Sequence, residues 1–381
     1  MIGLKSDKIV LANALFDGYV YVQDGKIVSV TDQALSCDQI FDFTGKYLSA
    51  GFIDLHTHGA GGYSFVNSTP EDVIAGCNFQ LLHGTTSVLP TVMASPFAVM
   101  KQAVADITAA KRSGKVMGNL VGAHLEGPYF SATQCGAQCP DYITPPIESE
   151  YRALVAEYGD AIARWSYAPE YDEGGRFARF LSENRIIASA GHTDAKYADI
   201  KVAAENGMNL ITHLYSCTST VTRDHGFRSL GVIESAFLRD DLYVEIIADG
   251  RHLPPELIQM IVKIKGVDKV ALVTDSMDIA GTDITHGFMG GTEFIVEDGV
   301  CKLCDRTAFA GSIATADRLI RVMRDECGYD LPTAVRMMTE VPASILKLQK
   351  GRICEGCDAD LIVFDDDIYI SDVFVGGKKK I

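Results

Sequence analysis

The sequence predicts an α/β protein: a (β/α)8 TIM-type barrel with a small β-sandwich domain built from both termini. Three observations predict this fold. Short apolar runs alternate with helical patterns through the middle of the chain, eight such runs occur, and both ends show strand and turn patterns alone. Alternation of strands and helices is typical of a parallel sheet, and eight repeats fit a closed barrel better than an open sheet.

The two ends of the chain are predicted to pair into one domain. Residues 20–30 contain two β-rich runs joined by Asp24 and Gly25, a pair typical of a tight hairpin turn. The C-terminal part contains similar short runs at 351–353, 360–365 and 372–377. Neither end is long enough to bury a sheet alone. We therefore expect residues 1–48 and 350–381 to form the β-sandwich and residues 49–349 to form the barrel.

The strands of the barrel are predicted from apolar runs. These lie near 51–56, 86–91, 118–125, 164–168, 186–190, 210–214, 243–248 and 270–275. Helical patterns separate most of them, as at 70–82, 96–113, 195–206 and 254–265. Residues 269–275 are nearly all apolar, as expected for a strand covered on both faces. Residues 287–303 interrupt the rhythm with β-like residues and predict an inserted hairpin.

Composition disfavours several classes of protein. Of 381 residues, 47% are apolar and 22% are charged, which excludes intrinsic disorder. The 50 acidic residues outnumber the 34 basic ones, and the net charge of −16 disfavours binding to nucleic acid or to membrane surfaces. No apolar run approaches the roughly 20 residues of a membrane span, and the N-terminus does not resemble a secretory signal. With ten scattered cysteines, interpreted as reduced thiols, we expect a cytoplasmic protein.

Two Cys-x-x-Cys spacings, Cys301/Cys304 and Cys354/Cys357, leave a structural zinc protein as an alternative. Each pair lies in a strand-and-turn pattern that already explains its residues. A four-thiolate zinc site is therefore the weaker interpretation, and metal analysis after substitution of Cys301 or Cys354 would separate the two.

Polar residues end most of the apolar runs, which is where the active sites of such barrels lie. His56 and His58 end the first run. Because residues i and i+2 of a strand share a face, both imidazoles can point at one ion. The later runs end in or lead to Glu126, His192, His213, His252 and Asp275. One histidine after a strand is more often structural, but five of the nine histidines at four strand ends indicate a metal site.

The remaining histidines carry weaker expectations. His83 precedes Gly84 at a helix end and is expected to be structural. His124 shares a strand face with Glu126 and could support the ligands from behind. His225 and His286 lie in loops and stay ambiguous.

The ligand types predict the chemistry. Imidazole and carboxylate suit Zn²⁺, Fe²⁺, Mn²⁺ or Co²⁺. A bound ion lowers the pKa of water to roughly 7 and polarises the carbonyl under attack, which favours hydrolysis. A carboxylate beside that water, Asp275, can accept its proton and deliver it to a leaving nitrogen.

Six motifs resemble those of the amidohydrolase superfamily and, more narrowly, of its N-acetylglucosamine-6-phosphate deacetylases. They are DLHTHG at 54–59, HLEGP at 124–128, GHT at 191–193, THL at 212–214, IADGRH at 247–252 and VTD at 273–275. FAGS at 309–312 and GCDADLIVFD at 356–365 match later elements of that family, so the resemblance covers essentially the whole chain. HLEGP together with ADGxH is the specific part, whereas His-x-His marks only the superfamily.

The resemblance implies a metal-dependent enzyme that converts N-acetylglucosamine 6-phosphate into glucosamine 6-phosphate and acetate, with Asp275 as general base and acid. It implies one or two divalent ions per subunit, Zn²⁺ first and Fe²⁺, Mn²⁺ or Co²⁺ otherwise. The metal ligands would be His56, His58, Glu126, His192, His213 and Asp275. The substrate-binding residues would be Ala137, Gln138, Ser216, Cys217, His225, Arg228, His252, Phe309, Ala310 and Gly311. A homodimer is expected, in which a cation of one subunit reaches the phosphate bound by the other.

Three segments depart from the family pattern. The family usually reads HLFNAM where this chain reads HLYSCT at 213–218, so Ser216 and Cys217 stand where other residues help hold the sugar phosphate. The glycine loop at 136–138 ends in Gln138, where a histidine is frequent. The candidates for the phosphate-binding residue are Arg223, His225 and Arg228. Arg228 is preferred because a guanidinium pairs with phosphate through two hydrogen bonds.

These departures keep two alternatives open. One is an amidohydrolase for another N-acyl amino sugar, such as N-acetylgalactosamine 6-phosphate, or for another amide. The other is a sugar-phosphate sensor without turnover, which Asp275 disfavours because a protein that only binds has no use for a proton acceptor beside a full ligand set.

Overall fold

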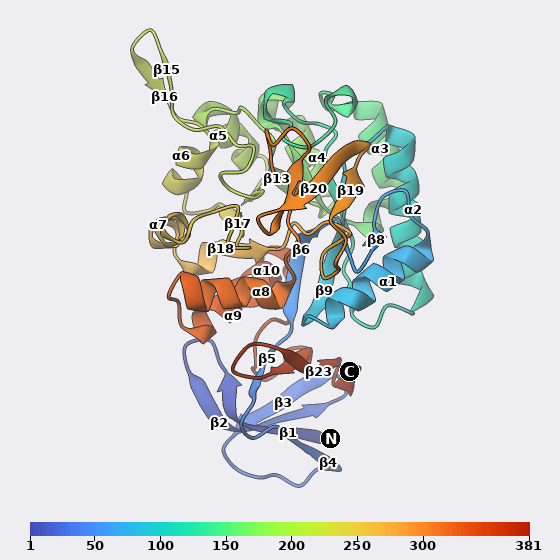
Figure 1. The fold of residues 1–381 in the computed structure, drawn as a ribbon, viewed down its shortest axis with the longest axis vertical. Helices are drawn as coiled ribbons and strands as arrows, with labels where there is room; N and C mark the ends of the chain where they lie inside the picture. Colours follow the sequence, from blue (N-terminus) through green and yellow to red (C-terminus); the bar gives the residue numbers. More distant parts are fainter.

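Eight parallel strands form the wall of a nearly closed barrel, which confirms the predicted fold class (Figure 1). The computed structural model describes all 381 residues. The strands are β6 (Phe52–Thr57), β9 (Thr85–Met93), β11 (Ala123–Glu126), β12 (Ile162–Tyr167), β13 (Ile187–Ala190), β14 (Leu210–Ile211), β17 (Tyr243–Ile247) and β18 (Val270–Val273). Each pairs with the next in this order, and a short strand β10 (Asn119–Leu120) also pairs with β9. A bridge between Thr57 and Ser276, together with a 2.9 Å hydrogen bond from the Asp275 amide to the His56 carbonyl, brings the two ends together.

Helices cover the outside of the barrel (Figure 1). They are α1 (Pro70–Leu81), α2 (Phe97–Ser113), α3 (Glu148–Tyr158), α4 (Arg176–Glu183), α5 (Tyr197–Glu205), α6 (Val232–Leu238), α7 (Pro255–Lys265), α8 (Ala316–Arg321), α9 (Leu331–Met338) and α10 (Glu340–Leu346). The four helices predicted at 70–82, 96–113, 195–206 and 254–265 are all present. Helix α1 begins at Pro70 because the Thr69 and Asp72 side chains accept each other's backbone amide protons, at 3.2 and 2.9 Å. A cluster of 73 buried apolar residues fills the space between strands and helices.

Both termini contribute to one β-rich flanking domain, as the sequence predicted. Its strands are β1 (Ile2–Val10), β2 (Leu15–Gln23), β3 (Lys26–Thr31), β4 (Gln39–Asp42), β5 (Tyr47–Ala50), β22 (Leu361–Phe364), β23 (Ile370–Val375) and β24 (Lys378–Lys379). Strand β5 joins the two ends, since it pairs in parallel with β1 and antiparallel with β22. Asp24 and Gly25 turn the β2–β3 hairpin with φ of 50° and 78°. The division at residues 48 and 350 stays a prediction.

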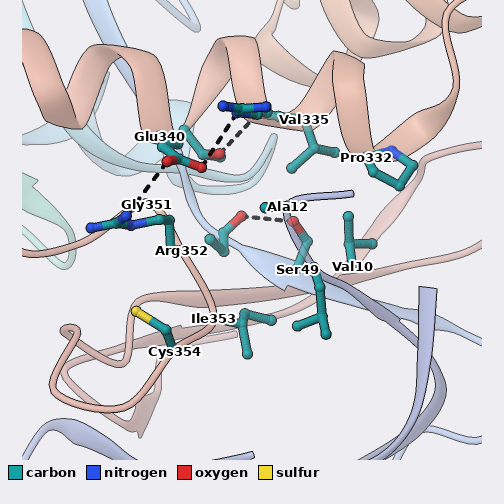
Figure 2. A pocket seen from close by; sticks show the side chains of 14 residues that line it. Val10, Ala12, Ser49, Pro332, Val335, Glu340, Gly351, Arg352, Ile353 and Cys354 are labelled. Atoms are coloured by element: carbon teal, nitrogen blue, oxygen red, sulfur yellow. Dashed lines mark hydrogen bonds and ion pairs between the residues drawn. The ribbon is translucent and has the colours of Figure 1, made fainter. Parts of the chain in front are cut away.

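The flanking domain lies at the N-terminal end of the barrel strands, because β6 begins two residues after β5 ends. A cavity of about 110 Å³ lies at this junction. Figure 2 shows residues that line it, among them Val10, Ser49 and Ile353. Glu340 lies 3.5 Å from both Arg336 and Arg352 there and so links the barrel to the flanking domain. The carboxyl ends of the strands, at the opposite end, are left for a functional site.

Two insertions lie near those carboxyl ends. The hairpin of β15 (Thr222–Asp224) and β16 (Phe227–Ser229) projects from the body (Figure 1). The predicted hairpin at 287–303 is instead a three-stranded antiparallel sheet of β19 (His286–Met289), β20 (Thr292–Glu297) and β21 (Val300–Leu303). A further two-stranded ribbon, β7 (Gly59–Ala60) and β8 (Tyr63–Ser64), follows β6. No helix combines the length and the apolar character needed to cross a bilayer.

Candidate active site

Six predicted ligands meet at the carboxyl ends of five barrel strands. His56 ends β6 and His58 follows it, Glu126 ends β11, and the others lie in the loops that follow β13, β14 and β18. All six are almost fully buried; none is more than 7% exposed. They are His56, His58, Glu126, His192, His213 and Asp275. The parallel topology therefore gathers residues that are far apart in the sequence into one small volume.

Glu126 lies at the centre of this group. Its Oε1 atom is 3.1 Å from Nε2 of His192 and 3.0 Å from Nε2 of His213. Its Oε2 atom is 3.3 Å from Nε2 of His58 and accepts a 2.7 Å hydrogen bond from the amide of Gln138. Oε1 thus faces His192 and His213, whereas Oε2 faces His58 and Gln138.

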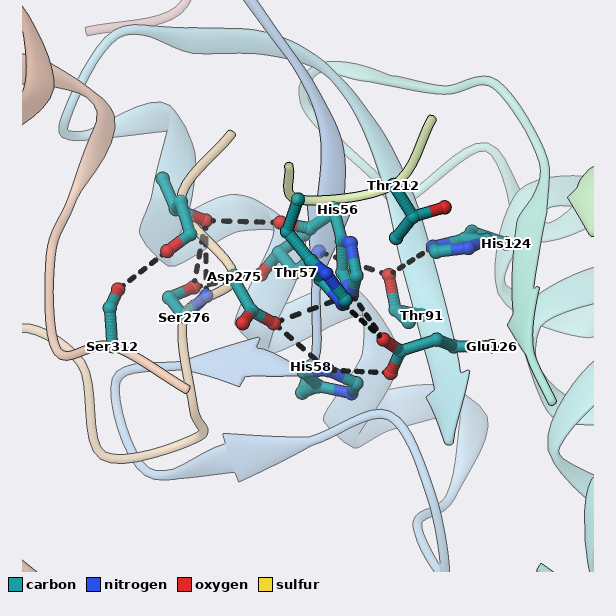
Figure 3. Close-up of polar contacts among 12 residues, drawn as sticks. His56, Thr57, His58, Thr91, His124, Glu126, Thr212, Asp275, Ser276 and Ser312 are labelled. Atoms are coloured by element: carbon teal, nitrogen blue, oxygen red, sulfur yellow. Dashed lines mark hydrogen bonds and ion pairs between the residues drawn. The ribbon is translucent and has the colours of Figure 1, made fainter. Parts of the chain in front are cut away.

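A second carboxylate faces Glu126 across the two histidines of β6 (Figure 3). The Oδ1 atom of Asp275 lies 3.3 Å from Nε2 of His56 and 3.2 Å from Nε2 of His58. Nε2 of His56 is also 3.4 Å from Oε1 of Glu126. The two imidazole rings therefore lie between two acids.

This donor set fits a divalent cation. Two groups of three potential ligands share Glu126, one with His56 and His58 and one with His192 and His213, and the donor atoms of each group lie within 4.8 Å of one another. The ring nitrogens of His56 and His58 are buried and make no hydrogen bond, so nothing in the chain satisfies them. Imidazole and carboxylate are ligands of Zn²⁺ and similar ions. No cysteine belongs to either group, and Cys301 lies in the inserted sheet, whereas Cys354 lies at the junction with the flanking domain.

The electrostatics of the site also favour a bound cation. Burial opposes ionisation of Glu126, but the surrounding imidazoles outweigh it and hold the pKa of this carboxyl well below its usual range. Burial likewise opposes the charge on Asp275, but His56 and His58 lower its pKa to about 2. Both acids are therefore ionised at neutral pH and depend on positive charge beside them, which the imidazoles or a bound cation can provide.

Backbone contacts fix the two histidines that approach Glu126. Nδ1 of His192 lies 2.9 Å from the Gln134 carbonyl, and Nδ1 of His213 lies 3.1 Å from the Ser216 carbonyl. Because a carbonyl accepts a proton from Nδ1, Nε2 is left free to bind an ion. His192, His213 and Asp275 also have positive φ values of 48°, 26° and 46°. Such strain at three non-glycine residues is typical of functional sites.

Two further histidines, His124 on β11 and His83 after α1, do not enter this group. His124 is fully buried and bonds to Thr91 at 3.1 Å and to Ser166 at 2.7 Å, while its ring packs edge-on against His56, 4.6 Å between centroids (Figure 3). It supports the site from behind, in agreement with expectation. Nδ1 of His83 lies 3.3 Å from Asp317, and His83 belongs to neither group of potential ligands.

A cavity of about 250 Å³ opens above the ligands. The predicted substrate-binding residues that line it are Ala137, Gln138, Ser216, Cys217, His252, Phe309 and Gly311. Ala310 is fully buried beside them and does not line the cavity. His225 and Arg228 also do not line it, because they lie on the projecting β15–β16 hairpin, where both are exposed. Substrate contact by all ten residues stays a prediction.

His252 is held firmly at the wall of this cavity. The Asp249 carboxylate accepts the His252 amide at 2.8 Å and lies 2.9 Å from its Nδ1 atom. Burial opposes ionisation of Asp249, but His252 lowers the pKa of this carboxyl. The ring packs against Phe309 with 5.0 Å between centroids. Nε2 of His252 is thereby the free donor or acceptor of the ring.

Gln138 lines the cavity and is also held within the chain. It is 3% exposed, donates to Glu126, and accepts a 2.9 Å hydrogen bond from the Ala94 amide. Both ends of its amide therefore have partners in the chain, and its contact with substrate stays a prediction.

Sequence reasoning missed four residues that line the cavity: Tyr215, Ile247, Met289 and Ala308. Tyr215 lies inside the HLYSCT segment, whose departure from the family pattern could have identified it as a residue of the cavity. Met289 reaches the cavity from the inserted sheet, and no local pattern indicates that this sheet folds over the barrel mouth.

Comparison with known proteins places these features in context. Residues 47–381 match the sequence profile of the amidohydrolase family. The chain is 32% identical over 376 residues to the N-acetylglucosamine-6-phosphate deacetylase of Bacillus subtilis, covering 96% of this chain and 94% of the relative. It is 32% identical over 342 residues to the N-acetylgalactosamine-6-phosphate deacetylase of a Shewanella species, covering 89% and 84%. The structure matches the N-acetylglucosamine-6-phosphate deacetylase of Pasteurella multocida with a TM-score of 0.92 at 29% identity, covering 100% of this chain and 99% of that one.

Proposed function

Because this chain belongs to the amidohydrolase family, we propose that it removes the acetyl group from N-acetylglucosamine 6-phosphate and releases glucosamine 6-phosphate and acetate. As a member of that metal-dependent family, it is a hydrolase of carbon–nitrogen bonds. The observation that carries the proposal is the convergence of His192 and His213 on one oxygen of Glu126, beneath a cavity large enough for part of a sugar.

We propose Zn²⁺ as the ion, with Fe²⁺, Mn²⁺ or Co²⁺ as possible replacements. Glu126, His192 and His213 would hold one ion, and His56 and His58, which also face Glu126, would hold a second. When bound, such an ion supplies a Lewis acid that polarises the amide carbonyl and lowers the pKa of water. Asp275 borders both histidines of the second group and completes the ligand set.

Asp275 is the proposed proton carrier. Its carboxylate is ionised and borders the Nε2 atoms of His56 and His58, so it lies where it can accept a proton from a water that attacks the amide there. It then gives that proton to the nitrogen of the collapsing tetrahedral intermediate. The C–N bond breaks, Asp275 returns to its ionised state, and the products are the amine and acetic acid. The remaining proton of the acid then passes to the amine or to solvent, which gives acetate.

The cavity lining is proposed to select the amino sugar. His252, oriented by Asp249, and Phe309 form one wall, and Ser216 and Cys217 form another. Ala137, Gln138, Ala310 and Gly311 complete the proposed sugar pocket. Polar groups there can bond to sugar hydroxyls, while Phe309 offers an apolar face for the ring.

We propose that His225 and Arg228 bind the phosphate of a substrate held by a second copy of the chain. Both are exposed on the β15–β16 hairpin and away from their own cavity, and Phe227 beside them is 80% exposed. A homodimer would cover that apolar ring and bring a local positive charge to an anionic substrate, which this acidic protein otherwise lacks. The homodimer and a cytoplasmic location both stay predictions.

Acetate release measured by mass spectrometry tests the proposal. Protein loaded with Zn²⁺ is expected to release acetate from N-acetylglucosamine 6-phosphate, and protein treated with a chelator is not. A second candidate substrate is N-acetylgalactosamine 6-phosphate, which the similarity to the Shewanella relative and the altered HLYSCT segment favour. Faster release from the galacto epimer would select the second candidate. Absence of acetate from both sugars would contradict both proposals.

A further inference from the structure

A fully buried ion pair lies inside the barrel close to the proposed metal site. Arg164, on β12, pairs with Glu245, on β17: Nη2 is 2.8 Å from Oε2, and Nη1 contacts Oε1. Both side chains are 0% exposed, which is true of no other pair between a Lys or Arg and an Asp or Glu in this structure. The runs that contain them are otherwise largely apolar, so two charges here are unexpected.

Such a pair needs a reason other than stability. Removing two charges from water costs about as much as their attraction returns, and apolar replacements of similar volume often stabilise a protein more. Branched apolar side chains usually fill the interior of a barrel of this kind. The presence of the pair therefore indicates a role for at least one of the two charges.

Glu245 faces the back of a proposed metal ligand. Its Oε2 atom is 3.8 Å from Nδ1 of His56, and no other carboxylate lies within 4.0 Å of that nitrogen. On the far side of the ring, Nε2 of His56 faces Glu126 and Asp275. Nδ1 itself is buried and makes no hydrogen bond. The imidazole therefore lies between Glu245 and the acids of the site.

Arg164 holds Glu245 in this position. Besides both oxygens of Glu245, its guanidinium donates to the Leu55 carbonyl at 3.3 Å, to Ser189 at 3.0 Å and to Thr212 at 2.8 Å. These contacts tie β12 to β6, β13 and β17 and to the loop that follows β14. Leu55 directly precedes His56, so the same guanidinium fixes both the carboxylate and the strand that carries the imidazole.

We propose that Glu245, held by Arg164, is a positioning residue that accepts the Nδ1 proton of His56 and so presents Nε2 to the metal ion. A neutral imidazole has one N–H, and an acceptor at Nδ1 selects the tautomer in which Nε2 can bind an ion. The present separation exceeds the roughly 2.8 Å of a charge-assisted hydrogen bond, so the contact must shorten by about 1 Å when the ring engages an ion. The inference rests on the proposed metal-dependent function.

The test measures metal binding without substrate. The Zn²⁺ dissociation constant, from competition with a chromogenic chelator, and the visible spectrum of the Co²⁺-loaded protein are compared for wild type and Glu245→Gln. The substitution keeps the shape and removes the charge. We expect the variant to bind Zn²⁺ about 10–100-fold more weakly, the usual effect of losing the carboxylate behind a ligating histidine, and to show a shifted Co²⁺ spectrum.

A double variant and a matched control keep the test decisive. Glu245→Gln leaves the Arg164 charge buried without a partner and could therefore destabilise the fold. The double variant Arg164→Met/Glu245→Leu removes both charges. We expect the double variant to fold and to bind Zn²⁺ as weakly as Glu245→Gln does. Asp360→Asn breaks the other well-buried pair, 2.6 Å from Lys350 at the flanking domain, and is expected to keep wild-type affinity.

Wild-type affinity and an unchanged Co²⁺ spectrum in the folded double variant would overturn the inference, because the pair would then serve the fold alone. Failure of the wild-type protein to bind any divalent ion would instead overturn the proposed function. The two failures are therefore distinguishable. In turnover, the folded Glu245 variants are expected to lose kcat at limiting Zn²⁺ while KM for the sugar stays within about twofold of wild type, since Glu245 does not line the cavity.

Discussion

Nε2 of His213 lies 3.0 Å from Oε1 of Glu126, although 87 residues separate them in the sequence. The contact exists because β11 and β14 run parallel and end at the same rim of the barrel, so that residues at their carboxyl ends share a small volume. The same oxygen lies 3.1 Å from His192, 66 residues away. Each proposed ligand comes from a different part of the chain. A single substitution can therefore test the contribution of one side chain to metal binding.

His213→Asn should weaken Zn²⁺ binding by more than about 100-fold and abolish acetate release, because one of three ligands to the first proposed ion is lost. Metal content after dialysis and turnover measure the two effects. His83→Asn is the matched control, since His83 pairs with Asp317 and belongs to neither group of potential ligands. Equal metal content in wild type and His213→Asn would contradict the assignment.

Chelation should destabilise the protein. A ligand present at 100 times its dissociation constant, bound by the folded state alone, contributes about 2.7 kcal/mol to the free energy of unfolding. The buried charges of Glu126 and Asp275 also lose their cation when the ion is removed. Thermal unfolding with and without excess chelator should show a lower Tm for the treated protein, restored by added Zn²⁺. An unchanged Tm would argue against an ion at this site.

Asp275→Asn should lower kcat for deacetylation by about 10²–10⁴-fold, because an amide can neither accept the proton of water nor return it to the leaving nitrogen. Glu126, His192 and His213 stay in place, so bound Zn²⁺ should be retained at one ion per chain or more. Acetate release and metal analysis separate the two quantities. Turnover at the wild-type rate in a variant with normal metal content would exclude Asp275 as the proton carrier.

Asp249→Asn should raise KM more than it lowers kcat. Asp249 orients the His252 ring and accepts backbone amides of the same loop, but it does not line the cavity. Loss of its charge frees the ring to rotate, which weakens sugar binding by roughly tenfold without touching the proposed ligands. Steady-state kinetics with Zn²⁺-loaded protein measure the split. A fall in kcat alone would assign His252 to the chemical step instead.

Lys265 should make the free energy of unfolding depend on pH. Its ammonium donates to the carbonyls of Ala236 and Arg239, and burial, followed by repulsion from Lys269, lowers its pKa to about 8 from a reference of 10.5. Between these values the unfolded chain binds more protons, so the contribution of Lys265 to stability rises as the pH rises from 8 to 10.5. Its partial exposure limits the effect to about 1 kcal/mol.

Chemical denaturation of wild type and Lys265→Met across that range isolates this contribution. The difference, wild type minus variant, should increase toward high pH, because the lost hydrogen bonds contribute equally at every pH. A flat difference would mean that the ammonium titrates at its ordinary value in the folded protein.

Local patterns were sufficient for the fold. Apolar runs such as 269–275 identified every barrel strand, and Asp24 with Gly25 located the first hairpin, because strand burial and turn geometry depend on neighbouring residues. The convergence of the six proposed ligands could also be inferred, since the carboxyl ends of parallel strands must meet.

Contacts that depend on tertiary packing could not be predicted in the same way. Met289 reaches the cavity only because the inserted sheet folds over the barrel mouth. Arg164 and Glu245 each break an apolar run, which indicates a buried partner of opposite charge, but the sequence does not identify that partner. Gln138 lines the cavity as expected of a residue near the substrate, but its hydrogen bonds to Glu126 and to the Ala94 backbone could not be predicted from the sequence.

Anomalous diffraction from crystals soaked in Zn²⁺, recorded above the zinc absorption edge, tests the shared cation most directly. The account predicts a peak about 2.0–2.2 Å from a carboxylate oxygen of Glu126 and from Nε2 of both His192 and His213. A zinc peak elsewhere in the molecule, with these three side chains free of any ion, would contradict it.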